Sequence, residues 1–122
     1  MEPADFSHMR RAMVDSQLRT NGVTDPWVLS AMGSVARESF VPAPFQATAY
    51  TDRSIMLGDG RTLNPPLATA LLLQAAEVAD DDKILLVGLP GGYVATLLSR
   101  RGVQAVVSET LTQLPGEART GN

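Results

Sequence analysis

Residues 82–101 read DKILLVGLPGGYVATLLSRR, and the pattern changes twice along this stretch. Ile84–Val87 is an unbroken apolar run, which is typical of a strand that is covered on both faces. Three glycines then mark a turn: Gly88, Gly91 and Gly92. After the turn, apolar residues recur at helical spacing at Val94, Leu97 and Leu98. Gly102 stands where such a helix is expected to end. The stretch therefore predicts a strand, a glycine-rich turn and a helix.

A second apolar run, Val103–Val107, follows the predicted helix and ends at Ser108-Glu109. These segments predict a βαβ unit, and so an α/β fold, with Glu109 about twenty positions after the turn. This layout is typical of sites for nucleotide-like cofactors, because the turn lets the backbone approach the ligand and the acid accepts hydrogen bonds from ribose hydroxyls. Two alternatives remain open. The turn can be a tight connection without a ligand, and Glu109 can be an ordinary solvated strand end.

The composition excludes several classes of protein. The chain has 122 residues, 44% of them apolar and 19% charged, so we expect a single domain, 1–122, with a buried core. The net charge is −3 and the pI is near 5.0, which disfavours broad electrostatic contact with nucleic acid. There is no cysteine, which excludes disulfides and thiolate chemistry and fits a cytoplasmic location.

The sequence does not predict attachment to a membrane. Met1–Asp5 is acidic and lacks the apolar core of a secretory signal. Leu67–Ala79 is the richest apolar stretch, but it is too short and too polar to span a bilayer, and it is interpreted as a buried helix. We assign no chemistry to the single histidine, His8, because a histidine on a helix surface is the simpler interpretation.

Two helices are predicted near the amino terminus. Asp5 can cap a helix that runs to about Thr20, and Asn21-Gly22 would end it. Asp25-Pro26 predicts the start of the second helix, with aspartate as the N-cap and proline at the first helical position. We expect this amphipathic pair to pack on a core.

A third helix is predicted after an irregular region that contains a short strand at Arg61–Leu63. Asn64-Pro65-Pro66 resembles a helix start, with asparagine as the cap, and the helix would run from Leu67 to about Val78. Its apolar residues surround nearly the whole helix, so we expect it to be enclosed. The chain therefore divides into a helical region, 1–79, and a partial βαβ unit, 80–122.

Several runs of sequence match one known family in order and in approximate spacing. They are Met13-Val14-Asp15-Ser16-Gln17-Leu18, Asp25 with Val28-Leu29-Ser30-Ala31-Met32, Arg37-Glu38-Ser39-Phe40-Val41-Pro42, Ala49-Tyr50-Thr51-Asp52, Gly58-Asp59-Gly60-Arg61-Thr62-Leu63, Gly92-Tyr93 and Glu109. On these runs the chain resembles protein-L-isoaspartate O-methyltransferase, a repair enzyme that uses S-adenosylmethionine. The combination of Arg-Glu-x-Phe-Val-Pro, Ala-Tyr-x-Asp and Gly-x-Gly is far more specific than a glycine turn alone.

The resemblance implies methyl transfer from S-adenosylmethionine to the side-chain carboxylate of isoaspartyl residues in damaged peptides or proteins. The ester then collapses to a succinimide, which reopens partly to normal aspartate. It implies the N-terminal helices and the first strands of a Rossmann-like methyltransferase sheet. Little acid–base help is needed, because the carboxylate is already ionised and the methyl group sits on a sulfonium leaving group. The protein has to align the reacting atoms and exclude water.

The resemblance also implies roles for particular residues. Cofactor contacts fall on Gly88, Gly91, Gly92, Tyr93 and Glu109. Asp52 and Asn64 would face the transferred methyl group, while Thr62 and Leu63 would line the peptide channel. The alternatives are a turn-forming role for Asp52, a helix-capping role for Asn64 and a core position for Leu63.

Three departures from the family pattern bear on activity. Leu86 stands where the family has an acid before the turn, and Pro90 replaces the middle glycine, which removes an N–H group. Asn64 replaces a serine whose hydroxyl is thought to orient the substrate carboxylate, although an amide can still donate a hydrogen bond. The chain also holds only the start of the family's sheet, so we expect open strand edges that would allow self-association.

These departures leave a second hypothesis open. The chain can be a truncated or degenerate relative that does not catalyse and acts as a binding or assembly domain. A fragment of another α/β nucleotide-binding protein, such as a dehydrogenase, is the third hypothesis, but it does not account for the matching N-terminal runs.

Overall fold

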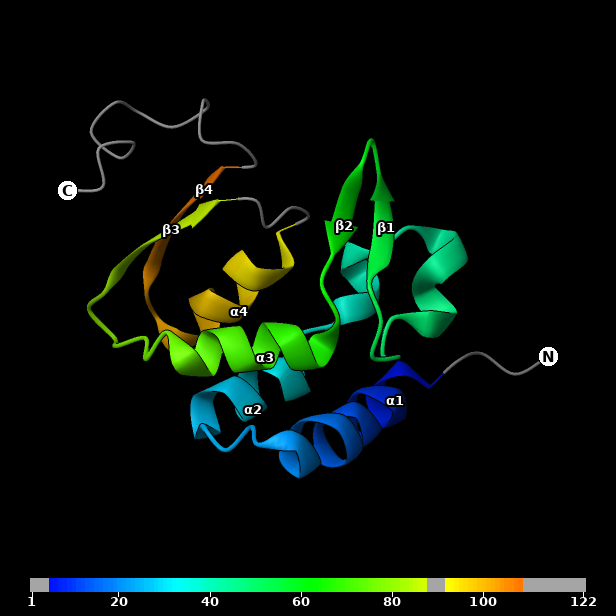
Figure 1. Cartoon of the computed structure of the whole chain (residues 1–122), viewed down its shortest axis with the longest axis horizontal. Coiled ribbons are helices and arrows are strands. Elements are labelled where there is room, and N and C mark those ends of the chain that lie inside the picture. Colours follow the sequence, from blue (N-terminus) through cyan, green and yellow to red (C-terminus); the bar gives the residue numbers. More distant parts are fainter. Residues whose placement is uncertain (1–4, 88–91, 109–122) are drawn as a thin grey trace.

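The computed structural model describes residues 5–87 and 92–108 of the chain (Figure 1). In these ranges the helices are α1 (Phe6–Met13), α2 (Pro26–Ser34), α3 (Pro66–Ala75) and α4 (Tyr93–Arg101). The strands are β1 (Ile55–Gly58), β2 (Arg61–Leu63), β3 (Lys83–Val87) and β4 (Gln104–Ser108). Four shorter helical segments complete the fold: η1 (Val14–Leu18), η2 (Arg19–Asn21), η3 (Arg37–Phe40) and η4 (Ala43–Thr48).

The predicted βαβ unit is confirmed. β3 and β4 pair in parallel, from Lys83 opposite Gln104 to Val87 opposite Ser108, and α4 connects them. Glycines with positive φ flank α4 at both ends, Gly92 at +79° and Gly102 at +84°. Because other residues rarely adopt this conformation, these two glycines set where the helix begins and ends.

The expectation that β3 is covered on both faces is wrong. Leu86 is buried, whereas Leu85 is 40% exposed and Val87 is 42% exposed. Successive side chains of a strand point to opposite faces, and α4 lies on the face of Ile84 and Leu86. In the described part of the chain no other element covers the face that Leu85 and Val87 occupy.

The third helix also differs from the prediction. α3 ends at Ala75 rather than near Val78, and the chain turns at Glu77, whose φ is +51°. Its N-cap is Pro65, so the capping role considered for Asn64 is wrong. The helix is not enclosed, because Leu71 and Leu72 are 39% and 49% exposed. Only part of the apolar surface of α3 is therefore buried in the core.

The amino-terminal helices form largely where the sequence predicts them. Asp5 Oδ1 caps α1 at the N–H of His8, and the helical path continues through η1 and η2 to Gly22, whose φ is +92°. Asp25 accepts a hydrogen bond from the N–H of Trp27, with Pro26 at the first position of α2.

One core joins the N-terminal helices to the βαβ unit. α2 contacts α1, α3 and α4, and η1 also packs against α3 (Figure 1). The fully buried side chains at its centre are Met13, Leu18, Val28, Met32, Leu97 and Leu98. The β1–β2 hairpin pairs Ile55 with Leu63 and lies beside the start of α3. Among the described helices, none combines the length and apolar character that a bilayer crossing needs.

Candidate functional site

The candidate site begins where α4 starts, after the carboxyl end of β3. Gly92 has a left-handed backbone and precedes the first turn of α4, so its conformation requires glycine. A side chain there would also approach Phe40, at 3.9 Å from the position of a Cβ atom. Gly88, Gly91 and Glu109, which the sequence assigns to the cofactor, lie outside the described residues.

Tyr93 points into the core rather than into an open site. Its side chain is fully buried, and its ring lies 5.6 Å from the ring of Phe40, measured between centroids. Burial raises the pKa of Tyr93 to about 12, an effect that the neighbouring Arg37 cation opposes. A contact between Tyr93 and a cofactor would therefore involve the backbone at the start of α4, not the phenol.

Arg37 is the functional candidate that residue-by-residue reasoning missed. It is fully buried, its Nε donates to the carbonyl of Ala49 at 2.5 Å, and its Nη2 donates to the carbonyl of Asn64 at 2.9 Å. Its guanidinium carbon lies 5.1 Å from the centroid of the Tyr93 ring. Burial lowers the pKa of Arg37, although Tyr93 opposes this shift. One side chain thus contacts both sides of the candidate site.

A polar network fixes the backbone around Arg37. Arg10 donates from Nε to the hydroxyl of Tyr50 at 2.8 Å and from Nη2 to Glu38 at 3.2 Å. The Tyr50 hydroxyl donates to Glu38 and accepts from the backbone N–H of Arg37 at 3.0 Å. Gln17 donates to the Tyr50 carbonyl at 2.7 Å. The Arg-Glu-x-Phe-Val-Pro and Ala-Tyr-x-Asp runs are therefore two halves of one interior network.

Glu38 makes this network sensitive to acid. Burial raises the pKa of Glu38, but the hydrogen bonds from Tyr50 and Arg10 outweigh it, so the net pKa lies below the ordinary value of 4.5. A carboxylate with a lowered pKa stabilises the fold above its unfolded pKa, and this contribution is lost as the pH falls through the folded pKa. The network should therefore weaken in acid.

We expect Glu38→Gln to lower the free energy of unfolding by about 2 kcal/mol at pH 7, because hydrogen bonds to a charged group are lost. The deficit should shrink as the pH falls below the ordinary value of 4.5, and it should be lost once the pH passes through the lowered pKa of the folded protein. Urea denaturation from pH 7 to pH 3 measures both effects. Asp15→Asn is the matched control, because its ion pair with Arg19 is exposed on both sides. A deficit that does not change with pH would contradict this assignment.

The residues that the resemblance assigns to the substrate lie on β2, between β2 and α3, and in the segment before β1. Asn64 is exposed, and its backbone carbonyl accepts the hydrogen bond from Arg37. Asp52 is also exposed, and its Oδ1 accepts from the N–H of Leu67 at 3.2 Å, so Asp52 caps the first turn of α3. Thr62 is exposed on β2, whereas Leu63 is buried in the core. The structure therefore brings Asn64 and Asp52 to the same helix start and places Leu63 in the interior.

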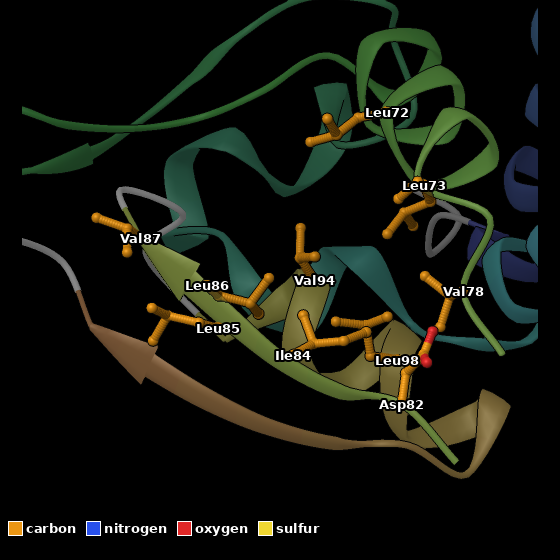
Figure 2. Close-up of a pocket in the computed structure, with 11 residues that line it drawn as sticks. Leu72, Leu73, Val78, Asp82, Ile84, Leu85, Leu86, Val87, Val94 and Leu98 are labelled. Carbon is orange, nitrogen blue, oxygen red and sulfur yellow. The ribbon is translucent and has the colours of Figure 1, made fainter. Parts of the chain in front are cut away.

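An apolar groove lies elsewhere, along β3. It has a volume of about 420 Å³ and is lined by α3, β3, α4 and the segment between α3 and β3 (Figure 2). The lining residues are Leu72, Leu73, Ala76, Val78, Asp82, Ile84, Leu85, Leu86, Val87, Val94 and Leu98.

Within residues 5–87 and 92–108 there is no cluster of histidine, aspartate and glutamate able to hold a metal ion.

Comparison with known proteins gives consistent matches. The family model for Protein-L-isoaspartate(D-aspartate) O-methyltransferase (PCMT) matches residues 9–120. A protein-L-isoaspartate O-methyltransferase from Methanoregula boonei is 35% identical over 117 residues, which are 96% of this chain and 54% of the relative. One from Roseiflexus castenholzii is 41% identical over 96 residues, which are 79% of this chain and 44% of the relative.

Solved structures share the fold. A protein-L-isoaspartate O-methyltransferase matches with a TM-score of 0.69 at 24% identity, over 80% of this chain and 33% of that chain. A Plasmodium falciparum protein described as such a methyltransferase, in complex with S-adenosyl-L-homocysteine, matches with a TM-score of 0.68 at 18% identity, over 80% and 47% of the two chains. The chain spans about half the length of the curated relatives it matches.

Proposed function

The chain belongs to the protein-L-isoaspartate O-methyltransferase family, and we propose that it takes part in methyl transfer to isoaspartyl carboxylates. In this proposal it supplies the glycine turn that contacts the cofactor and one side of the channel that holds the peptide substrate. The observation that supports this proposal most is the Arg37 side chain, which contacts both the Asn64 carbonyl and the Tyr93 ring. A substrate-side segment and the start of the cofactor helix therefore meet at one buried group.

The residues present fit the start of an S-adenosylmethionine site. The left-handed Gly92 allows close approach to the backbone, and the first turn of α4 offers N–H groups that its own helix does not use. With Gly88, Gly91 and Glu109 assigned from the sequence, these groups would hold the cofactor. When bound, the cofactor supplies a methyl group on a sulfonium, which needs no general base because the accepting carboxylate is ionised.

Asn64 and Asp52 take different roles in this proposal. The exposed Asn64 amide would donate a hydrogen bond to the substrate carboxylate and so orient it. Asp52 would act mainly by capping α3 through Leu67, which holds the helix start beside Asn64. Thr62, exposed on β2, would line the path of the peptide. These contributions are positional, as a displacement with a good leaving group requires.

A second candidate is a binding or assembly role without catalysis. Leu86 supports it, because this residue stands where the family has an acid and its side chain is buried in the core. In this reading the sequence at β3 contributes to stability rather than to a ligand. Pro90 favours the same candidate by sequence, since proline removes a backbone donor from the turn.

Binding of S-adenosylhomocysteine separates the two candidates. For the 122-residue chain the catalytic proposal predicts weak but measurable binding by calorimetry, because Pro90 removes a donor and Leu86 offers no acceptor, whereas the second candidate predicts undetectable binding. Pro90→Gly should tighten binding, whereas Pro44→Gly, in the η4 segment, should not. A methyl-transfer assay with an isoaspartyl peptide completes the test. Micromolar affinity with turnover in the unaltered chain would overturn the expectation of weak binding, and no gain from Pro90→Gly would contradict the backbone argument.

Two further expectations belong to the proposal. Isoaspartyl-containing proteins are the expected partners, and the cytoplasm, which the lack of cysteine fits, is the expected location. The edge of β3 that faces away from β4 is unpaired among the described strands, so we also propose that two copies associate there.

A further inference from the structure

We propose that Arg37 is a positioning residue, whose buried guanidinium fixes Asn64 relative to the first turn of α4. The meaning of this inference for catalysis rests on the proposed function, but the contacts that define it do not. The Arg37 side chain has no solvent-exposed surface, so it can affect a substrate only through the segments that it contacts.

The guanidinium uses its edge and its face for different segments. Along the edge, Nε and Nη2 donate to two carbonyls, those of Ala49 and Asn64. The face lies against the ring of Tyr93, with the guanidinium carbon 5.1 Å from the centroid. Three segments that are distant in sequence are thus held at one point: the end of η4, the start of α3 and the start of α4.

The planar shape of arginine is what this arrangement needs. A planar fork donates two hydrogen bonds in fixed directions while its face stacks on an aromatic ring. Lysine offers a point charge on a flexible stem, so it cannot hold both carbonyls and the ring in the same geometry. A purely space-filling residue would be apolar, because burying a charge is costly. The hydrogen bonds therefore distinguish Arg37 from a packing residue.

The backbone of Arg37 is itself held by a hydrogen bond, which fixes the position from which the side chain extends. Its N–H donates to the Tyr50 hydroxyl at 3.0 Å, and that hydroxyl belongs to the network with Arg10 and Glu38. Asn64 is followed by two prolines, which restrict the chain directly after the held carbonyl. Fixing this carbonyl therefore limits where the exposed Asn64 amide can point.

NMR spectroscopy tests the inference without cofactor or substrate. In the unaltered chain the Arg37 Nε–H should give a resolved, slowly exchanging signal, because it is buried and donates to Ala49. Replacing the ring by Tyr93→Leu should move this signal, whereas Tyr93→Phe, which keeps the ring, should leave it nearly unchanged. A signal at the position of exposed arginines with rapid exchange would overturn the proposal, whatever the variants do.

Arg37→Lys tests the coupling between the two segments. We expect the side-chain amide signal of Asn64 and the N–H signals of Gly92 and Tyr93 to shift together. Arg101→Lys is the matched control, since Arg101 Nε also donates to a backbone carbonyl, that of Val78, but at a distant place. A lower melting temperature with unchanged Asn64 and Tyr93 signals would show a merely structural role and overturn the proposal. Because no ligand is used, failure here is distinct from failure to bind S-adenosylhomocysteine.

Discussion

Replacing Tyr93 with alanine is expected to lower the free energy of unfolding by about 4 kcal/mol, the usual cost of removing a fully buried aromatic ring. The ring fills the space between Phe40 and the guanidinium of Arg37, and α4 begins at this residue. Tyr93→Ala would therefore leave a cavity and would also remove the aromatic face that stabilises a buried cation.

Tyr93→Phe separates the ring from the hydroxyl. The Tyr93 hydroxyl is buried and makes no hydrogen bond of ordinary geometry within residues 5–87 and 92–108, but it lies close enough to the buried Arg37 cation for the two groups to shift each other's pKa. Losing this contact and removing a poorly satisfied polar group act in opposite directions, so Tyr93→Phe should change the free energy of unfolding by less than about 1 kcal/mol. Chemical denaturation followed by circular dichroism measures both variants. A loss of stability in Tyr93→Phe as large as that in Tyr93→Ala would contradict the assignment, because it would place the stabilisation in the hydroxyl rather than in the ring.

The sequence predicts the parts of the fold that local chemistry controls. Asp25 and Pro26 begin α2, because a capping carboxylate and a proline with fixed φ act within one turn of the helix. The βαβ unit follows from an apolar run, the glycine turn and a second apolar run, whose order restricts how the strands can pair. Gly92 could be singled out because a sharp strand-to-helix turn commonly needs a positive φ.

The predictions that were wrong depend on distant contacts. The apolar surface of α3 suggests enclosure, but composition cannot reveal whether another element covers Leu71 and Leu72. Asn64 looks like a cap because it stands just before two prolines, yet the side chain that caps α3 is that of Asp52, from before the hairpin. In both cases the outcome is decided by residues that are far apart in the sequence.

Arg37 shows the same limit from the functional side. In the sequence, Arg37 is one residue of a run that matches the family, and it precedes Glu38. An arginine beside a glutamate is usually an exposed charge. Its Nε and Nη2 instead donate to backbone carbonyls, while Glu38 pairs with Arg10 and Tyr50. An available signal was the apolar neighbourhood formed by Val35, Phe40 and Val41, which predicts a buried segment.

The proposed pairing of two copies through β3 should be weakened by charges in the groove. The groove between α3 and β3 carries the exposed side chains of Leu72 and Leu85, and β3 has one edge without a partner among the described strands. A two-fold axis would set β3 against the β3 of the second copy and would bring both grooves together. The second copy is the occupant that we favour, because every copy offers the same strand edge and the same apolar lining.

The double variant Leu72→Lys with Leu85→Lys is expected to weaken dimerisation about a hundredfold, or about 2.7 kcal/mol. Each lysine occurs in both copies, so like charges meet across the two-fold axis, while both positions are exposed enough for the monomer to remain folded. Sedimentation over a range of concentrations measures the effect. Met56→Lys is the matched control, because Met56 is 69% exposed on β1 and lines no part of the groove. If the unaltered chain sediments as a monomer at every concentration, or if Met56→Lys weakens the dimer equally, the β3 edge is not the interface.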